Sequence, residues 1–210
     1  MSKVTLSNKL APAIAVGALL SACATVGTDV GWNVPPVGST WQVSQRNTGS
    51  YGKDLTFQVT RGESVWQGLQ VVTFTNSANG TTVMALPNGK WAAILARDGK
   101  PLVTWDPPIG YVYPLSIGQS WSTRHKMTSA SGSSTDITYS CKVEGRESVT
   151  VPAGTFDTMK IVCQSPVQRD ISWSIVDHGM HAKQEFQRLA NHPQGAGTQQ
   201  NQLMALNRRS

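Results

Sequence analysis

Apolar side chains recur at every second position in short runs along this chain. The clearest runs are Leu55–Phe57–Val59 and Ile137–Tyr139–Cys141–Val143. Successive side chains of an extended strand point to opposite faces, so a period of two predicts half-buried β-strands. Before residue 191, no stretch carries a long apolar stripe with the helical period of about 3.6 residues. The sequence therefore predicts an all-β fold of antiparallel curved sheets, with little helix outside a signal peptide.

Turn-forming residues separate these runs. Residues 87–89 are Pro-Asn-Gly and residues 98–99 are Asp-Gly, and both lie between short apolar segments. Such residues connect consecutive antiparallel strands. The adjacent Pro107 and Pro108 lack backbone N–H donors, which a central strand requires. We therefore place the main connection of the chain at these prolines.

Short matching segments suggest two related β-halves. The segments 38–41 and 118–121 both begin with Gly and end with Trp, and Glu-Ser-Val occurs at 63–65 and again at 147–149. Trp91 and Trp173 occupy comparable later places. Coincidence is the alternative, because strand sequences have low diversity. We expect a first half at 38–106 and a second at 107–190.

The last residues, 191–210, are rich in Gln, Asn and Gly. They contain no series of apolar runs separated by turns, so we expect a flexible tail. The alternative is a short docking helix that uses Leu203, Met204 and Leu206.

The first residues have the parts of a bacterial signal peptide. Lys3 and Lys9 precede a short apolar run, which ends in Leu20-Ser-Ala-Cys23. The run is shorter than the roughly 20 residues of a membrane-spanning helix. Residues 20–23 resemble the lipobox of bacterial lipoproteins. An ordinary signal peptide with a chance cysteine, or an uncleaved anchor, is the alternative.

This resemblance implies a lipid anchor on Cys23. In lipoproteins the cysteine thiolate takes a diacylglyceryl group and residues 1–22 are removed, so the membrane would be the partner of the mature chain. The following residue is Ala24 and not Asp. For a Gram-negative host this implies sorting to the outer membrane, facing the periplasm. Residues 23–37 read as a tether, in which Trp32 either contacts the membrane interface or docks on the domain.

The second half contains Val-Pro-Ala-Gly-Thr-Phe at 151–156. This segment resembles a hairpin found in a group of secreted and lipoprotein β-domains of unknown function. The resemblance implies a fold and no particular activity. The residues support a turn by themselves, since Pro152 fixes φ and Gly154 accepts positive φ. Ser174 and His178 depart from the Tyr and Pro that are common in these domains.

Cys141 and Cys163 lie at equal distances in sequence from Pro152. Strand parity turns both side chains inward and allows them to face each other across two strands. In an oxidising periplasm this favours a disulfide bond. Two buried free thiols are the alternative.

The charge pattern argues against nucleic-acid binding. The formal net charge is +6, but the basic residues are scattered singly apart from Arg208 and Arg209. A nucleic-acid binder presents its cations as a continuous patch or stripe.

Residues with catalytic potential are few. Asp177, His178 and His181 lie close in sequence, and with a further ligand they offer a site for Zn²⁺. In a strand, however, positions three apart face opposite sides, and Gly179 suggests a turn. The acidic residues are dispersed, and no hydrolase, zinc-protease or nucleotide motif occurs. We therefore predict no metal site, no cofactor and no catalytic residues.

Seven tryptophans are many for a chain of 210 residues. Most fit strand positions where aromatic side chains fill a core. Trp66 lies near a turn and Trp105 precedes the proline pair, so these two are the candidate residues of a ligand groove.

Together these features predict a lipid-anchored, non-catalytic binding or interaction module of the cell envelope. Its partner would be a hydrophobic ligand or an envelope protein. An open apolar cleft containing Trp would favour the ligand, and a filled core with a flat exposed patch would favour the protein. The alternative function is a metal-assisted envelope enzyme that uses Asp177, His178 and His181.

Overall fold

The computed structural model describes Met1 and residues 29–209. The predicted signal peptide and Cys23 lie outside these residues. No helix long and apolar enough to cross a membrane occurs in the described part of the chain. Its twelve strands are β1 (Thr40–Gly49), β2 (Leu55–Trp66), β3 (Leu69–Asn76), β4 (Thr82–Ala85), β5 (Trp91–Leu95), β6 (Pro101–Ile109), β7 (Ser120–Ser129), β8 (Ser134–Val151), β9 (Gly154–Gln164), β10 (Gln168–Ile175), β11 (His181–Arg188) and β12 (Gly197–Asn207).

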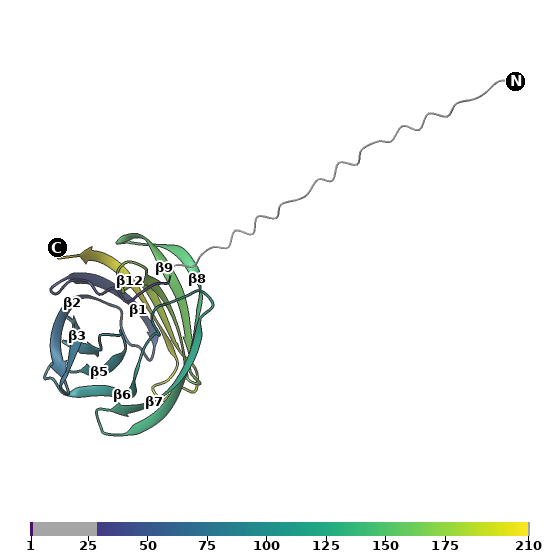
Figure 1. Ribbon diagram of the computed structural model, residues 1–210. Coiled ribbons are helices and arrows are strands. Elements are labelled where there is room, and N and C mark those ends of the chain that lie inside the picture. The colour runs from purple at the N-terminus through teal and green to yellow at the C-terminus, as the bar shows by residue number, and fades with distance from the viewer. Residues whose placement is uncertain (2–28, 210) are drawn as a thin grey trace.

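All twelve strands form one closed antiparallel barrel. Each strand pairs with the next along the chain, and β12 returns to pair with β1. In Figure 1 the yellow β12 lies beside the purple β1, which closes the wall. The prediction of an all-β, antiparallel fold is confirmed. The strands of the two predicted halves share this single sheet.

The predicted turns lie between the strands where the sequence indicates them. Gly89 has φ +84° in the turn before β5, and Gly99 has φ +82° in the turn before β6. In each turn the preceding side chain accepts a hydrogen bond from a backbone N–H: Asn88 Oδ1 from Lys90 N, and Asp98 Oδ1 from Lys100 N. Glycine tolerates positive φ because it has no Cβ.

The hairpin at 151–156 also forms. β8 ends at Val151 and β9 begins at Gly154, so Pro152 and Ala153 make the connection. Gly154 has φ +135°, and Phe156 packs against the buried cluster that contains Val151. The local chemistry of proline and glycine therefore produces the expected reversal.

The break that we predicted at Pro107 and Pro108 is wrong. Both residues belong to β6, and the main connection is 110–119. The pairing of β6 with β7 ends at Asp106, and on the other side the register with β5 shifts between Thr104 and Ile109. The prolines therefore occupy an irregular part of the strand, where no ladder donor is required of them.

The predicted flexible tail contains the strand that closes the barrel. Residues 197–207 pair with β1 on one side and with β11 on the other. Leu203 is only 1% exposed, in a cluster with Val151, Ile175, Met180 and Ala182. Neither the frayed tail nor the docking helix is present over this range.

The described end of the predicted tether packs on the barrel. Val30 is 4% exposed, and its backbone exchanges two hydrogen bonds with Leu115. Pro35 is also fully buried. Residues 29–37 are therefore part of the folded domain.

The repeated segments lie at partly equivalent places. Trp41 and Trp121 are each the second residue of β1 and β7, and Glu63 and Glu147 lie in β2 and β8. The third pair does not follow this pattern, because Trp91 begins β5 whereas Trp173 lies within β10.

Candidate functional site

A cavity of about 560 Å³ lies inside the barrel and is partly open to solvent. Its lining comes from strands throughout the barrel and from Trp32 of the N-terminal segment. Small-molecule sites in proteins are usually cavities of roughly 300–1,000 Å³. The volume therefore suits a small organic ligand.

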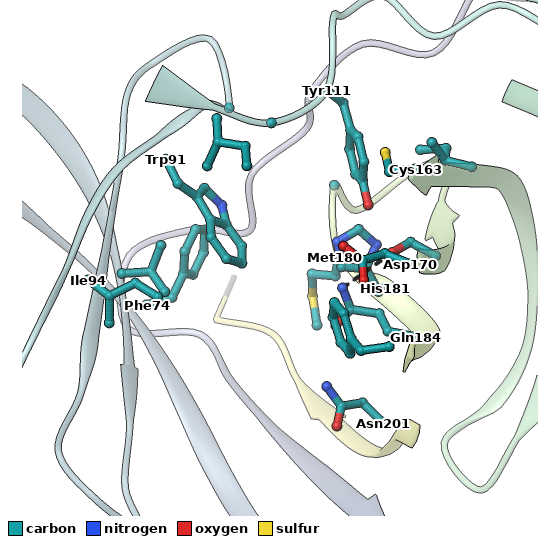
Figure 2. A pocket seen from close by; sticks show the side chains of 18 of the residues that line it. Phe74, Trp91, Ile94, Tyr111, Cys163, Asp170, Met180, His181, Gln184 and Asn201 are labelled. Atoms are coloured by element: carbon teal, nitrogen blue, oxygen red, sulfur yellow. Dashed lines mark hydrogen bonds between the residues drawn. The ribbon is translucent and has the colours of Figure 1, made fainter. Parts of the chain in front are cut away.

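One wall of the cavity is apolar. It is made by side chains of β2–β6 that point inward, namely Phe57, Val59, Phe74, Val83, Trp91, Ile94, Trp105 and Ile109. Figure 2 shows Phe74, Trp91 and Ile94 together on this side. Most of these side chains keep partial exposure, because the cavity leaves part of their surface uncovered.

The opposite wall, called the polar wall below, carries polar side chains, although Trp41, Val43, Phe186 and Leu203 of the same strands also line the cavity. Its side chains come from β1 and β10–β12, namely Gln45, Gln168, Asp170, Ser172, His181, Gln184, Gln199 and Asn201. In Figure 2, Asp170, His181, Gln184 and Asn201 lie across the cavity from Trp91. Strand pairing places Ser172 opposite Gln184 and Gln184 opposite Asn201, so one face carries polar groups over three neighbouring strands.

Side-chain amides form a ladder at one part of the polar wall. Gln45 Nε2 donates to Gln199 Oε1 over 3.0 Å, and Gln199 Nε2 donates to Asn201 Oδ1 over 3.3 Å. These bonds fix the amide orientations across β1 and β12. The wall is therefore an ordered hydrogen-bonding surface.

Asp170 contributes a carboxyl group to this wall. Its Oδ1 accepts a hydrogen bond from Gln168 Nε2 over 2.8 Å. Burial disfavours the charged form and raises the pKa of Asp170 to about 6, although the bond from Gln168 acts in the opposite direction. At neutral pH a carboxylate therefore faces the cavity.

His181 lies at the start of β11, beside the ring of Tyr111. The two ring centroids are 5.8 Å apart and the planes are nearly perpendicular. Burial lowers the pKa of His181 to about 4, so its imidazole is neutral at pH 7. Its Nδ1 is buried and has no hydrogen-bond partner among residues 29–209.

Two tyrosines, Tyr111 and Tyr113, also line the cavity. Burial raises the pKa of Tyr113 to about 12 and raises the pKa of Tyr111 further, so both phenols stay protonated. They can act as neutral hydrogen-bond donors.

The N-terminal segment covers part of the cavity with Trp32. The Trp32 ring lies 6.4 Å from that of Tyr113, centroid to centroid. A Cβ at Gly89 would lie 2.9 Å from Trp32, and one at Gly179 would lie 2.5 Å from the carbonyl oxygen of Asn33. These glycines let the segment approach the barrel closely. Of the two alternatives for Trp32, docking on the domain is the one observed.

The two candidate groove residues, Trp66 and Trp105, lie in different places. Trp105 lines the cavity, whereas Trp66 does not. Trp66 packs against a cluster of Val71, Met84, Ala93 and Leu95, which do not line the cavity either. Trp66 has even parity on β2, opposite to the inward-pointing Phe57 and Val59, which is the physical reason for the difference.

Cys141 and Cys163 form the predicted disulfide bond. Both also line the cavity. They pack against Val143, Met159 and Ile161 in the largest buried cluster. The bond therefore ties together β8 and β9 at the cavity wall.

The residues of the alternative enzyme hypothesis do not converge. His178 Nδ1 contacts the Arg208 guanidinium over 2.6 Å, and the Asp177 carbonyl oxygen accepts a hydrogen bond from the same group. His181 instead faces the cavity. Within residues 29–209, no group of three His, Cys, Asp or Glu side chains has the arrangement of a metal site.

Sequence reasoning missed most of the polar wall. The residues concerned are Gln168, Asp170, Ser172, Gln184, Gln199 and Asn201. The available signal was the polar residue at every second position of 168–172 and 199–201, with the parity of an inward face.

No protein-family model matches the chain, and no curated protein matches it. The solved structures that are similar include the following three. A candidate lipoprotein of Parabacteroides distasonis has 14% identity and a TM-score of 0.46, over 85% of this chain and 99% of that one. A candidate exported protein with a YmcC-like fold from Bacteroides fragilis has 12% identity and a TM-score of 0.46, over 85% and 100%. The hypothetical lipoprotein YmcC of Escherichia coli has 10% identity and a TM-score of 0.45, over 80% and 84%.

Proposed function

We propose that this chain is a lipid-anchored, non-catalytic binding protein of the bacterial cell envelope, which holds an amphipathic small molecule inside its barrel. The observation that carries the proposal is the cavity with one apolar and one polar wall. An apolar tail would cover the exposed faces of Phe74, Trp91 and Ile94, and a polar head would meet Asp170 and Gln184.

The energetics of the apolar wall favour such a ligand. Each Å² of apolar surface removed from water contributes about 25 cal/mol. The aromatic side chains of this wall keep surface that a ligand tail would cover. The polar groups opposite would then fix the ligand's orientation rather than supply most of the affinity.

The cavity supports a small ligand, rather than an envelope protein, as the proposed partner. A partner protein would need a flat apolar patch over a filled core, whereas the centre of this barrel holds a cavity next to Trp91 and Trp105. The exposed large apolar side chains include Val65 and Leu69 at the β2–β3 turn, and Leu102 and Ile117 lie on other elements. A ligand therefore accounts for more of the structure than an envelope protein.

The location of the protein in the cell envelope is part of the proposal. It rests on the resemblance of residues 20–23 to a lipobox and on Ala24, which in a Gram-negative host leads to the outer membrane. A lipid on Cys23 would hold the barrel at the membrane surface, facing the periplasm.

A matched pair of variants tests the binding function. Ile94→Trp fills the apolar wall, whereas Ile117→Trp places the same ring at a residue that is 51% exposed and does not line the cavity. Binding of dodecyl amphiphiles is measured by native mass spectrometry, with circular dichroism to verify folding. We expect Ile94→Trp to weaken binding at least tenfold and Ile117→Trp to leave it unchanged. If the wild type binds no amphiphile, or if both variants bind as it does, the proposal is wrong.

A further inference from the structure

The polar wall carries chemistry that restricts the ligand. Resting on the proposed function, we infer that the cavity takes amphiphiles whose head group donates hydrogen bonds and carries no negative charge, and that it discriminates against free fatty acids. The juxtaposition that carries this inference is an acidic side chain and an unpartnered imidazole on one wall of a cavity whose lining contains no arginine.

The ionisable residues that line the cavity are few. They are one carboxyl group, one amine, two imidazoles and three phenols, from Asp170, Lys183, His125, His181, Tyr111, Tyr113 and Tyr139. The His125 Nδ1 hydrogen-bonds the Pro107 carbonyl oxygen over 2.7 Å, so its proton is directed at the backbone. No arginine lines the cavity.

Lys183 carries the only amine among the described lining residues, and its ammonium group contacts side chains that do not line the cavity. Lys183 Nζ lies 2.6 Å from Glu185 Oε1 and 4.7 Å from the centroid of the Trp173 ring. Neither Glu185 nor Trp173 lines the cavity. Strand parity places Lys183 opposite to Gln184, whose side chain belongs to the polar wall. The cation of Lys183 is therefore directed away from the site of a ligand head group.

Asp170 keeps capacity to accept hydrogen bonds. Gln168 Nε2 donates to one oxygen, Oδ1, and no other side chain of the described residues donates to this carboxylate. A hydroxyl, amide or ammonium group of a ligand would satisfy the second oxygen. A charged donor would gain more than a neutral one, because hydrogen bonds between ionised groups are stronger.

His181 adds unused hydrogen-bonding capacity to the same wall. Its Nδ1 is buried without a partner in the described part of the chain, and Figure 2 shows the ring beside Asp170. An unpaired buried polar atom costs free energy in the unliganded protein. A head group that bonds with this imidazole would remove that cost.

A carboxylate head group would be disfavoured at this wall. It would bring a second negative charge to Asp170, and no guanidinium or free ammonium group of the lining would compensate. Like charges in a partly desolvated site repel strongly. The fatty-acid head group is therefore the one that this wall disfavours.

Three probes with the same tail test the inference. Monolauroylglycerol, dodecylamine and laurate are titrated below their critical micelle concentrations at pH 8, where Asp170 is ionised, and tryptophan fluorescence reports binding. We expect monolauroylglycerol and dodecylamine to bind at least tenfold more tightly than laurate. Asp170→Asn should reduce the preference of the cavity for the amine over laurate at least fivefold. The matched control is Asp136→Asn, an exposed carboxylate that pairs with Arg124 and does not line the cavity.

The outcomes separate this inference from the proposed function. If laurate binds as tightly as the other two probes, or if Asp170→Asn keeps the full preference, the head-group inference is overturned and the binding function stands. If none of the three probes binds, the proposed function fails. Retained discrimination in Asp136→Asn together with its reduction in Asp170→Asn supports the inference.

Discussion

Cys141 and Cys163 lie directly opposite each other on β8 and β9, with their Cα atoms 4.0 Å apart, and a disulfide bond joins them. The bond closes a loop that contains the whole 151–156 hairpin. It also borders the cavity, so it constrains the unfolded chain and the shape of the site together.

Reduction of this bond should lower the free energy of unfolding. For two cysteines 22 residues apart, the lost loop-closure entropy corresponds to about 3 kcal/mol. Urea unfolding with and without dithiothreitol measures the difference. The double variant Cys141→Ala/Cys163→Ala is the control, because dithiothreitol should not change its midpoint. A wild-type midpoint that is insensitive to reductant would contradict the prediction.

Truncation of Leu203 should show that the last strand is part of the barrel. Leu203→Ala removes a side chain that is 1% exposed, and such core truncations cost about 2–5 kcal/mol. Leu69→Ala, at a position that is 56% exposed, should change the free energy of unfolding by less than about 1 kcal/mol. Equal effects of the two variants in urea unfolding would place residues 197–207 outside the cooperative fold.

Asp170 should make the protein less stable as the pH rises. Its folded pKa is about 6, above the ordinary value of 3.8, so the fold favours the protonated form. The contribution of Asp170 to the free energy of unfolding is therefore full below pH 4, falls between pH 4 and 6, and stays lower above that range. Asp170→Asn should be more stable than the wild type at pH 8, by as much as about 3 kcal/mol, and about equal at pH 4. Thermal unfolding of the variant at both pH values measures the effect.

His181 should oppose this trend in the wild type. Its pKa of about 4 in the fold lies below the ordinary 6.5, so its contribution is lost as the pH falls through that range. The two groups therefore offset each other between pH 4 and 6. Between pH 4 and 6, the free energy of unfolding of Asp170→Asn should therefore rise with pH, and more steeply than that of the wild type. A flat profile for the variant would contradict the assignment.

Gly179 should control the docking of residues 29–37. A Cβ at Gly179 would lie 2.5 Å from the Asn33 carbonyl oxygen, so Gly179→Ala should displace the segment and Trp32. Gly99→Ala is the matched control, since Gly99 also has positive φ but nothing lies within 4 Å of its added Cβ. Hydrogen exchange at Val30 should accelerate at least tenfold in Gly179→Ala and remain unchanged in Gly99→Ala. Similar rates in both variants would refute a steric role for Gly179.

Cys23 should determine where the protein resides. Cys23→Ser removes the sulfur that a lipid would require, so the variant should leave the membrane fraction. Fractionation and intact mass measure this, and Cys141→Ala, which leaves Cys23 in place, is the control. A membrane-bound Cys23→Ser variant, together with a wild-type mass without acyl groups, would contradict the lipid anchor.

The strand class and several turns could be predicted because their signals are local. Alternation at residues 137–143 and the chemistry of Asn88–Gly89 act within a few residues. Strand parity and the equal distances of the two cysteines from Pro152 were enough to predict that Cys141 faces Cys163. The break at Pro107 was predicted wrongly. Because the register of β6 with β5 shifts here, Pro107 does not need to donate a backbone hydrogen bond to a neighbouring strand. That shift depends on a partner strand, which the local sequence does not reveal.

The polar wall could not be recognised from composition. Sequence patterns normally assign apolar residues to the inside, but Gln199 and Asn201 point inward because the centre of the barrel is a cavity. Their polarity made β12 resemble a tail. Trp66 and Trp105 illustrate the same limit, since only their parity relative to the closed sheet determines which one packs on a buried cluster outside the cavity and which one lines the cavity.

The pairing of β12 with β1 also determines when the protein can complete its fold. Gly197–Asn207 form the last of the twelve described strands, yet they supply the partner of Thr40–Gly49 in the first. The two edges cannot join until residues 197–207 are available to pair with residues 40–49. Until then the unfinished sheet keeps two open edges, each a row of unpaired backbone groups that another chain could pair with.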